Sequence, residues 1–358
     1  MAIEQVWLEP GQDGDTWQMS FACQVCLRPF SERVALKWGF NAQALLAEAA
    51  DRQRLFIEAQ YQGNILSEDP PDKRTVVLRC IRVPGKGLLL ALMGKVCAAT
   101  PELAHQQSIQ YCRELVSAFP TDYRIYPAIS QTAFEKLAGK DMLEKCTSTD
   151  TLAKILRFEM APIPSVHVFG CWQTSDRSDE QIWRALGNYP EAVVLNISLR
   201  QTQIQFAERQ ILWNLIQGHP SATEDPQAQA PMPLAKWAEE LIKRRMSPWK
   251  KFYYLQVHLA CPAAVSTSIT RPIGAAITRE TPDLITPGYQ IQHPSDLADL
   301  DKWRQSLLRL DILPSEVYSS SLSRLSDIAD LTEAQAVFRL PYPPEEGLPD
   351  VQFVDRLE

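Results

Sequence analysis

Three short segments of the chain are rich in apolar β-branched and aromatic residues: "RTVVLRCIRV" (74–83), "EAVVLNISLRQ" (191–201) and "FYYLQVHLAC" (252–261). Such runs predict strands inside a sheet, and the third alternates so that Leu255, Val257 and Leu259 share one face. A sheet with an apolar face needs helices to cover it. The sequence therefore predicts an α+β fold, with helices on one side of each sheet.

The segments around these strands recur in a similar order in two parts of the chain. In the first part we expect strands at 33–40, 54–62 and 74–83 and helices at 41–53, 87–99 and 101–119. In the second part we expect strands at 166–174, 191–201 and 252–261 and helices at 178–189, 205–217, 233–246 and 268–278. The shared order predicts a duplication of a split β-α-β (ferredoxin-like) unit.

Changes in composition suggest where these parts meet. Pro162 and Pro164 force an extended chain, so we place a boundary near residue 160, with halves at 1–160 and 161–290. The stretch 217–233 is rich in proline and has no aromatic residue, which predicts a mobile surface loop within the second half. Residues 291–358 are predicted to form a helical segment that ends in a proline-rich strap.

The charge and the terminal sequence limit the location and the partners. The net charge of −7 means that any contact with nucleic acid must use a local basic patch. The N-terminal residues lack the basic and apolar regions of a secretory signal, and the apolar run 87–99 contains Lys95 and is too short to span a bilayer. We expect a cytoplasmic protein without a membrane partner.

The chain shows no pattern that identifies a catalytic, metal or cofactor site. Cys23 and Cys26 have the spacing of a redox or metal pair, but no second pair of ligands follows, so we interpret the cysteines mainly as buried apolar residues. Gly85-Lys86-Gly87 lacks the remaining residues of a phosphate-binding loop and is interpreted as a turn. The histidines form no pattern with each other or with a nucleophile. We therefore predict no enzymatic activity, no cofactor and no metal for this chain by itself.

The most concentrated chemistry lies in "IKRRMSPWKKFYYLQ". Cations and rings in one segment could bind phosphates and bases, or an acidic protein. The alternative is structural, because cations stabilise the end of a helix and aromatic residues favour the start of a strand. The candidate patch for nucleic acid or a partner comprises Lys243, Arg244, Arg245, Trp249, Lys250 and Lys251.

A second distinctive segment is "EAQAVFRLPYPPEEGLPD" (333–350). Its prolines end the preceding helix near Leu340 and stiffen the path that follows. The candidate connector or interface residues are Phe338, Arg339, Leu340, Pro341, Leu348 and Pro349. The alternative is an ordinary tail that caps the surface of a domain.

This segment resembles the one that precedes the motor domain in HerA/FtsK-type ATPases, including those related to conjugative type IV secretion ATPases. In that family a helix with a Glu-Ala or Glu-Leu pair ends in a phenylalanine or histidine and then Leu-Pro, before a stretch rich in proline and glycine. The matching residues here are Glu333, Ala334, Phe338, Arg339, Leu340, Pro341, Gly347, Leu348 and Pro349. No nucleotide-binding motif follows Pro349, so the chain is either the N-terminal portion of a longer motor or a separate protein with the accessory region alone.

The resemblance implies a non-catalytic region that assembles or docks partners for a HerA-like DNA-translocating ATPase, supplied in the same chain or by another. It also implies an oligomer, because the motors of this family form rings. A second hypothesis is a standalone protein-interaction scaffold with no motor and no nucleic acid. A third is an enzyme whose site is dispersed along the sequence.

Overall fold

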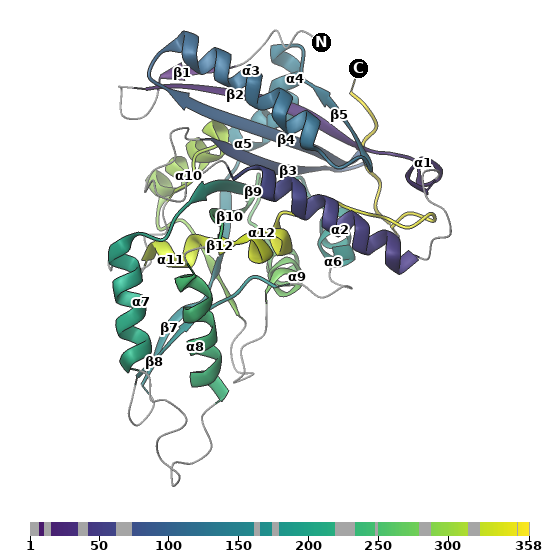
Figure 1. Ribbon diagram of the computed structural model, residues 1–358. Helices are drawn as coiled ribbons and strands as arrows, with labels where there is room; N and C mark the ends of the chain where they lie inside the picture. Colours follow the sequence, from purple (N-terminus) through teal and green to yellow (C-terminus); the bar gives the residue numbers. More distant parts are fainter. Residues whose placement is uncertain are drawn as a thin grey trace.

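The computed structural model describes residues 7–10, 16–34, 42–61, 74–160, 165–173, 179–218, 233–247, 250–278, 288–313, 323–348 and 350–357. Within these ranges the strands form one ten-stranded antiparallel sheet and a separate two-stranded one (Figure 1). Helices cover the large sheet, and the predicted α+β class is confirmed.

The large sheet contains two units with the same order of elements. The first unit consists of β2 (Trp17–Leu27), α2 (Ala42–Ala59), β3 (Thr75–Val83), β4 (Gly87–Ala98), α3 (Pro101–Ala118) and β5 (Tyr123–Pro127). The second consists of β6 (Ser148–Lys154), α6 (Asp179–Gly187), β9 (Val193–Thr202), β10 (Phe252–Cys261), α9 (Thr267–Ile277) and β11 (Tyr289–Gln292). In each unit the fourth strand pairs with the first, the first with the third, and the third with the second. This is a split β-α-β arrangement, but the strands that open the two units are β2 and β6, whereas the sequence predicts them at 33–40 and 166–174, and the latter segment overlaps β8 of the separate two-stranded sheet.

The two units join edge to edge through the antiparallel pairing of β3 with β9, from Val76 opposite Leu199 to Arg82 opposite Val193. The first strand of the second unit, β6, lies before the predicted boundary at residue 160. The topology therefore divides the chain earlier, in the connection formed by α4 (Gln131–Ala138) and α5 (Lys140–Glu144).

Additional elements extend these units. In the second unit α7 (Phe206–Gly218) and α8 (Pro233–Met246) form an insertion between β9 and β10, and in Figure 1 this helical pair lies at the end of the molecule away from both termini. The predicted loop at 217–233 overlaps the ends of these helices, and residues 219–232 lie outside the described residues. The remaining elements are β1 (Trp7–Pro10), α1 (Phe30–Val34), β7 (Leu156–Met160), β8 (Ser165–Phe169), α10 (Leu297–Arg309), α11 (Ser323–Asp327), β12 (Ile328–Asp330) and α12 (Leu331–Val337).

Both faces of the large sheet are covered, contrary to the prediction of helices on one side. Along β3, Val76 and Leu78 belong to the core beneath α2, α3, α6 and α9, whereas Val77 and Ile81 belong to a second core beneath α4, α5 and α10. Successive side chains of a strand point to opposite faces, so a strand covered on both sides is apolar throughout. Burial of both faces therefore explains why the apolar runs in the sequence are uninterrupted.

Two predicted elements are wrong. The segment 54–62, predicted as a strand, forms the last turns of α2 through Ala59, and 87–99, predicted as a helix, forms β4. β4 pairs with β2 on one side and β3 on the other, which satisfies its backbone in an apolar interior. The predicted strand at 33–40 begins inside α1, and residues 35–41 lie outside the described residues.

Candidate functional site: a buried ion-pair cluster

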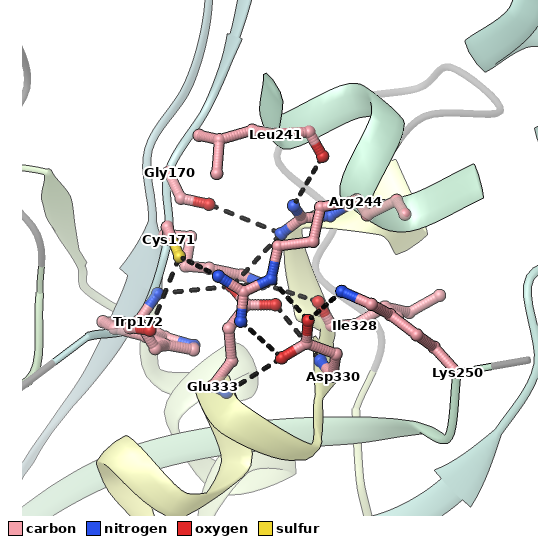
Figure 2. Close-up of polar contacts among 11 residues, drawn as sticks. Gly170, Cys171, Trp172, Leu241, Arg244, Lys250, Ile328, Asp330 and Glu333 are labelled. Atoms are coloured by element: carbon pink, nitrogen blue, oxygen red, sulfur yellow. Dashed lines mark hydrogen bonds and ion pairs between the residues drawn. The ribbon is translucent and has the colours of Figure 1, made fainter. Parts of the chain in front are cut away.

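Ionisable side chains from three distant parts of the chain meet beside the start of α12 (Figure 2). α8 contributes Arg244 and Arg245, β6 contributes Lys154, and the acidic partners are Asp330 and Glu333. Among these, Lys154, Arg245 and Glu333 have side chains that are 0%, 1% and 2% exposed. Charges removed from water to this extent need partners, and the cluster supplies them.

Asp330 and Glu333 are positioned by the first turn of α12. Asp330 is the N-cap residue: its Oδ1 accepts a hydrogen bond from the Glu333 amide at 3.0 Å. In return, Oε2 of Glu333 accepts from the Asp330 amide at 3.1 Å. This reciprocal capping box fixes both carboxylates at the helix N-terminus, where the helix dipole favours negative charge.

The second carboxylate oxygen of Glu333 receives three donors. Oε1 lies 3.1 Å from Nζ of Lys154, 3.3 Å from Nη2 of Arg245 and 3.2 Å from the amide nitrogen of Trp172. Lys154 also donates to the carbonyl oxygen of Ile328 at 2.5 Å. One carboxylate therefore joins β6, α8 and the segment after β8 to α12.

Asp330 organises the outer part of the cluster. The guanidinium of Arg244 binds both of its carboxylate oxygens, with Nη2 2.6 Å from Oδ1, and Nζ of Lys250 lies 3.1 Å from Oδ2. Two donors in the plane of a guanidinium match two carboxylate oxygens, so this pair is specific in geometry as well as charge.

The electrostatics follow from burial and from these contacts. Burial alone would raise the pKa of Glu333, but the charges of Lys154 and Arg245 outweigh it and lower that pKa below its ordinary value. The pKa of Asp330 is lowered in the same way, because hydrogen bonds from Arg244 outweigh the rise that burial alone would cause. Burial lowers the pKa of Lys154 to about 8; the nearby charge of Glu333 opposes this shift, and that of Arg245 adds to it. Both carboxylates are therefore ionised at neutral pH.

The predicted basic patch is largely part of this network. Beyond the cluster, Lys251 lies 2.7 Å from Glu58 of α2, and Lys243 pairs with Glu239 one turn earlier on α8. Lys243, Arg244, Arg245, Lys250 and Lys251 each have an acidic partner in the chain, and Trp249 lies outside the described residues. This pairing favours the structural alternative, and a contact with nucleic acid stays a prediction.

The connector segment packs against the first unit. Phe338 is 1% and Leu340 2% exposed, and the Phe338 ring lies 6.3 Å from that of Phe56 on α2. The side chain of Gln53, also on α2, accepts from the Leu340 amide at 3.0 Å and donates to the Leu340 carbonyl at 3.2 Å. Tyr123 donates its hydroxyl to the Pro341 carbonyl at 2.8 Å.

Beyond these prolines the chain continues along the first unit. The main chain of Gln352 and Val354 brackets Leu88 of β4, with hydrogen bonds of 2.7 and 2.8 Å, and Gln24 of β2 donates to the Asp355 carbonyl at 2.9 Å. Leu348 is buried, the Arg339 amide donates to the Val337 carbonyl, and Pro349 lies outside the described residues. We refer to residues 338–357 as the strap; in Figure 1 it runs in yellow from α12 past α2.

The two weaker sequence motifs have local structural explanations. Cys23 is buried in the core beneath α3, with Sγ 3.9 Å from Sγ of Cys112, whereas Cys26 lies three residues along the same strand and therefore on the opposite face. Gly85 and Lys86 belong to the tight turn between β3 and β4, and Gly85 has a φ of 74° that favours glycine. A strand, not a helix, follows this turn, so the context of a phosphate-binding loop is missing here.

The acidic half of the cluster is what sequence reasoning missed. Asp330-Leu-Thr-Glu333 has the spacing of a capping box, a signal that could have predicted both side chains at a helix start. Lys154, in contrast, carries no local signal, because its acidic partner lies 179 residues further along the chain.

Further searches of the described ranges give negative findings. They contain no group of three or more His, Cys, Asp or Glu side chains arranged to hold a metal ion. Within the same ranges, every helix is too short or too polar to cross a bilayer. No protein-family model matches the chain, and a search of curated proteins finds no similar sequence.

Proposed function

We propose that this chain is a non-catalytic docking region, located in the cytoplasm, that assembles protein partners around a HerA-like DNA-translocating ATPase. The ATPase motor is supplied in the same chain or by another. The resemblance of 333–349 to the segment before such motors motivates the motor as partner. The buried cluster supports a structural role for the chain, because Lys154, Arg245 and Glu333 are paired with each other and closed to solvent.

The observation that carries docking is an exposed face of α7. Phe206 and Trp213 are 75% and 51% exposed, and they lie seven residues apart, on one side of the helix. The exposed residues between and after them, Ala207, Gln210, Asn214 and Gln217, are uncharged, and the half-buried Arg209 lies at the edge of this face. The opposite side of α7 is packed through Leu212. Large exposed aromatic residues on an uncharged face are typical of protein interaction sites.

This proposal is tested by measuring the mass of assemblies that the purified chain forms with candidate motor subunits. We expect ring-sized complexes only in the mixture, and a variant with Phe206→Gln and Trp213→Gln should bind at least about tenfold more weakly, as expected for truncated aromatic anchors. Leu297→Gln is the matched control, because Leu297 is 82% exposed on α10 and lies away from this face. Undiminished assembly of the α7 variant, or no complex with any motor, contradicts the proposal.

The paired state of the basic segment favours a second candidate, the scaffold with neither motor nor nucleic acid. Lys243, Lys250 and Lys251 retain partial exposure, but each faces a carboxylate. Under the scaffold hypothesis the chain binds other proteins through α7 and shows no salt-dependent affinity for duplex DNA. DNA binding that weakens steeply with salt would contradict this candidate.

A further inference from the structure

A cavity of about 290 Å³ lies between β2, the α4–α5 pair and α10, on the face of the sheet opposite α3. It is independent of the ion-pair cluster and of the α7 face. Its lining is partly apolar and partly charged: Gln18, Ser20, Phe134, Ala138, Lys140, Glu144, Arg304, Gln305, Leu308 and Arg309. Its volume is at the lower end of the range for small-molecule sites, which suits one ring and one attached group.

Cations outnumber carboxylates in this lining. The lining contains three cations, Lys140, Arg304 and Arg309, and one acid, Glu144, although the chain as a whole is acidic. Acids outside the lining partly offset these charges: Glu135 lies 2.9 Å from Lys140, Asp141 is a second acid near Lys140, and Asp301 lies 3.5 Å from Arg304. Asp301 is 60% exposed, so its pair with Arg304 is weak.

Arg304 has unused hydrogen-bonding capacity. Its Nη2 donates to the Cys146 carbonyl at 3.1 Å, which fixes the guanidinium, but its Nε is shielded from solvent and has no hydrogen-bond partner among the described residues. A shielded donor without an acceptor is costly, and one on a cation is costlier still. The same shielding closes Nε to a ligand, so an oxyanion in the cavity would bind through the Nη atoms, of which Nη1 makes a 3.5 Å contact with the exposed Asp301, on a guanidinium that is already held in place.

From the cavity, its two arginines and its apolar wall, we propose that this site binds a small organic oxyanion: one ring that carries a carboxylate or a phosphate ester. The ring packs on Phe134, Ala138 and Leu308, and the oxyanion binds Arg304 and Arg309. Guanidinium groups suit both anions because their donors match two oxygens at once. Since the lining comes from β2, α5 and α10, the bound molecule bridges the first unit to the helix that follows the second.

The test uses titration calorimetry with the full chain and three probes: phenyl phosphate, benzoate and the neutral benzyl alcohol. We expect saturable binding of an oxyanion probe, with benzyl alcohol at least about tenfold weaker, because it lacks the charge-assisted bonds. The anion with the higher affinity, phenyl phosphate or benzoate, shows whether the site prefers a phosphate ester or a carboxylate. Equal affinity for the neutral probe, or no saturable binding of either anion, overturns the proposal.

Variants assign the binding to this cavity. Arg309→Met and Arg304→Met should each weaken the oxyanion by about tenfold. Leu308→Trp, which fills the cavity, should abolish binding even where Arg304→Met fails to fold. Arg271→Met is the matched control, because Arg271 is exposed on α9, across the sheet from α10, and its loss should leave the affinity unchanged. Unchanged binding in Arg309→Met and Leu308→Trp overturns the proposal.

Discussion

Glu333 shows how strongly one residue can determine local structure. Its carboxylate caps α12 and also balances two buried cations, Lys154 and Arg245. Glu333→Gln keeps the size of the side chain but removes the carboxylate that both cations contact. Removal of one partner from a buried ion pair costs about 3 kcal/mol or more of unfolding free energy. We expect a loss of that size at pH 7, measured by urea denaturation.

The control for this substitution is Glu239→Gln. Glu239 pairs with Lys243 on the surface of α8, where the lysine is 61% exposed, so its loss should cost less than about 1 kcal/mol. The effect of Glu333→Gln also depends on pH. The folded pKa of Glu333 lies below the ordinary value of 4.5, so its contribution is complete above pH 4.5 and is lost as the pH falls through the folded pKa. The stability difference between wild type and variant should therefore shrink in acid; a constant difference would contradict the charge argument.

At the scale of elements, α12 is connected to the first unit by contacts with the main chain of the strap. Gln53 of α2 binds both the amide and the carbonyl of Leu340, and the prolines that follow offer no amide of their own. Gln53→Leu keeps an apolar body but leaves two buried backbone groups unpaired. Each such group costs about 1 to 3 kcal/mol, so we expect a loss of at least about 2 kcal/mol in thermal or urea unfolding.

A matched control for Gln53→Leu is Gln131→Leu. Gln131 begins α4 at the surface and bonds to the exposed Glu135 one turn later. Its replacement should change the stability by no more than about 0.5 kcal/mol. Equal effects of the two substitutions would show that Gln53 does not hold the strap.

The elements also show which features were predictable from the sequence. A duplication of split β-α-β units was predicted from the order of strong strands and amphipathic helices, but its strands were only partly identified: the second unit opens with β6 rather than at 166–174, and 87–99, interpreted as a helix, is β4. An apolar run of that length fits either a buried helix or a strand, and the pairing of β4 with β2 and β3 decides for the strand. The pairing also explains Gly94. A Cβ at this position would lie 2.2 Å from the ring of Phe21, the residue opposite it on β2.

The candidate site was less predictable than the fold. The cations of α8 form one conspicuous group in the sequence, but their structural role depends on Asp330 and Glu333, more than 80 residues away. Separation in sequence hides such pairs, since no local period connects them. The proline-rich strap was recognised because its residues are adjacent in the sequence, and the capping box could have been recognised for the same reason.

At the scale of the whole molecule, strand pairing and the strap are two of the contacts that join the two units. β3 pairs with β9 at the edge where the units meet, and the strap leads from α12, beside the second unit, onto α2 and β4 of the first. A sheet that continues through both units has no free edge between them, so opening one unit exposes strand edges of the other. We therefore expect the two units to unfold as one cooperative body.

Phe338→Ala tests this cooperativity. Phe338 is 1% exposed, directly after α12, and packs on Phe56 of α2, so its truncation leaves a cavity between the units and should cost about 3 to 5 kcal/mol. Native-state hydrogen exchange then measures where the loss appears. We expect the slowest amides of β2 and β4 and those of β6 and β10 to lose the same protection free energy, because they exchange through one global unfolding. If the amides of one unit lose protection while those of the other keep it, the units unfold separately, and the strap is only a covering of the first.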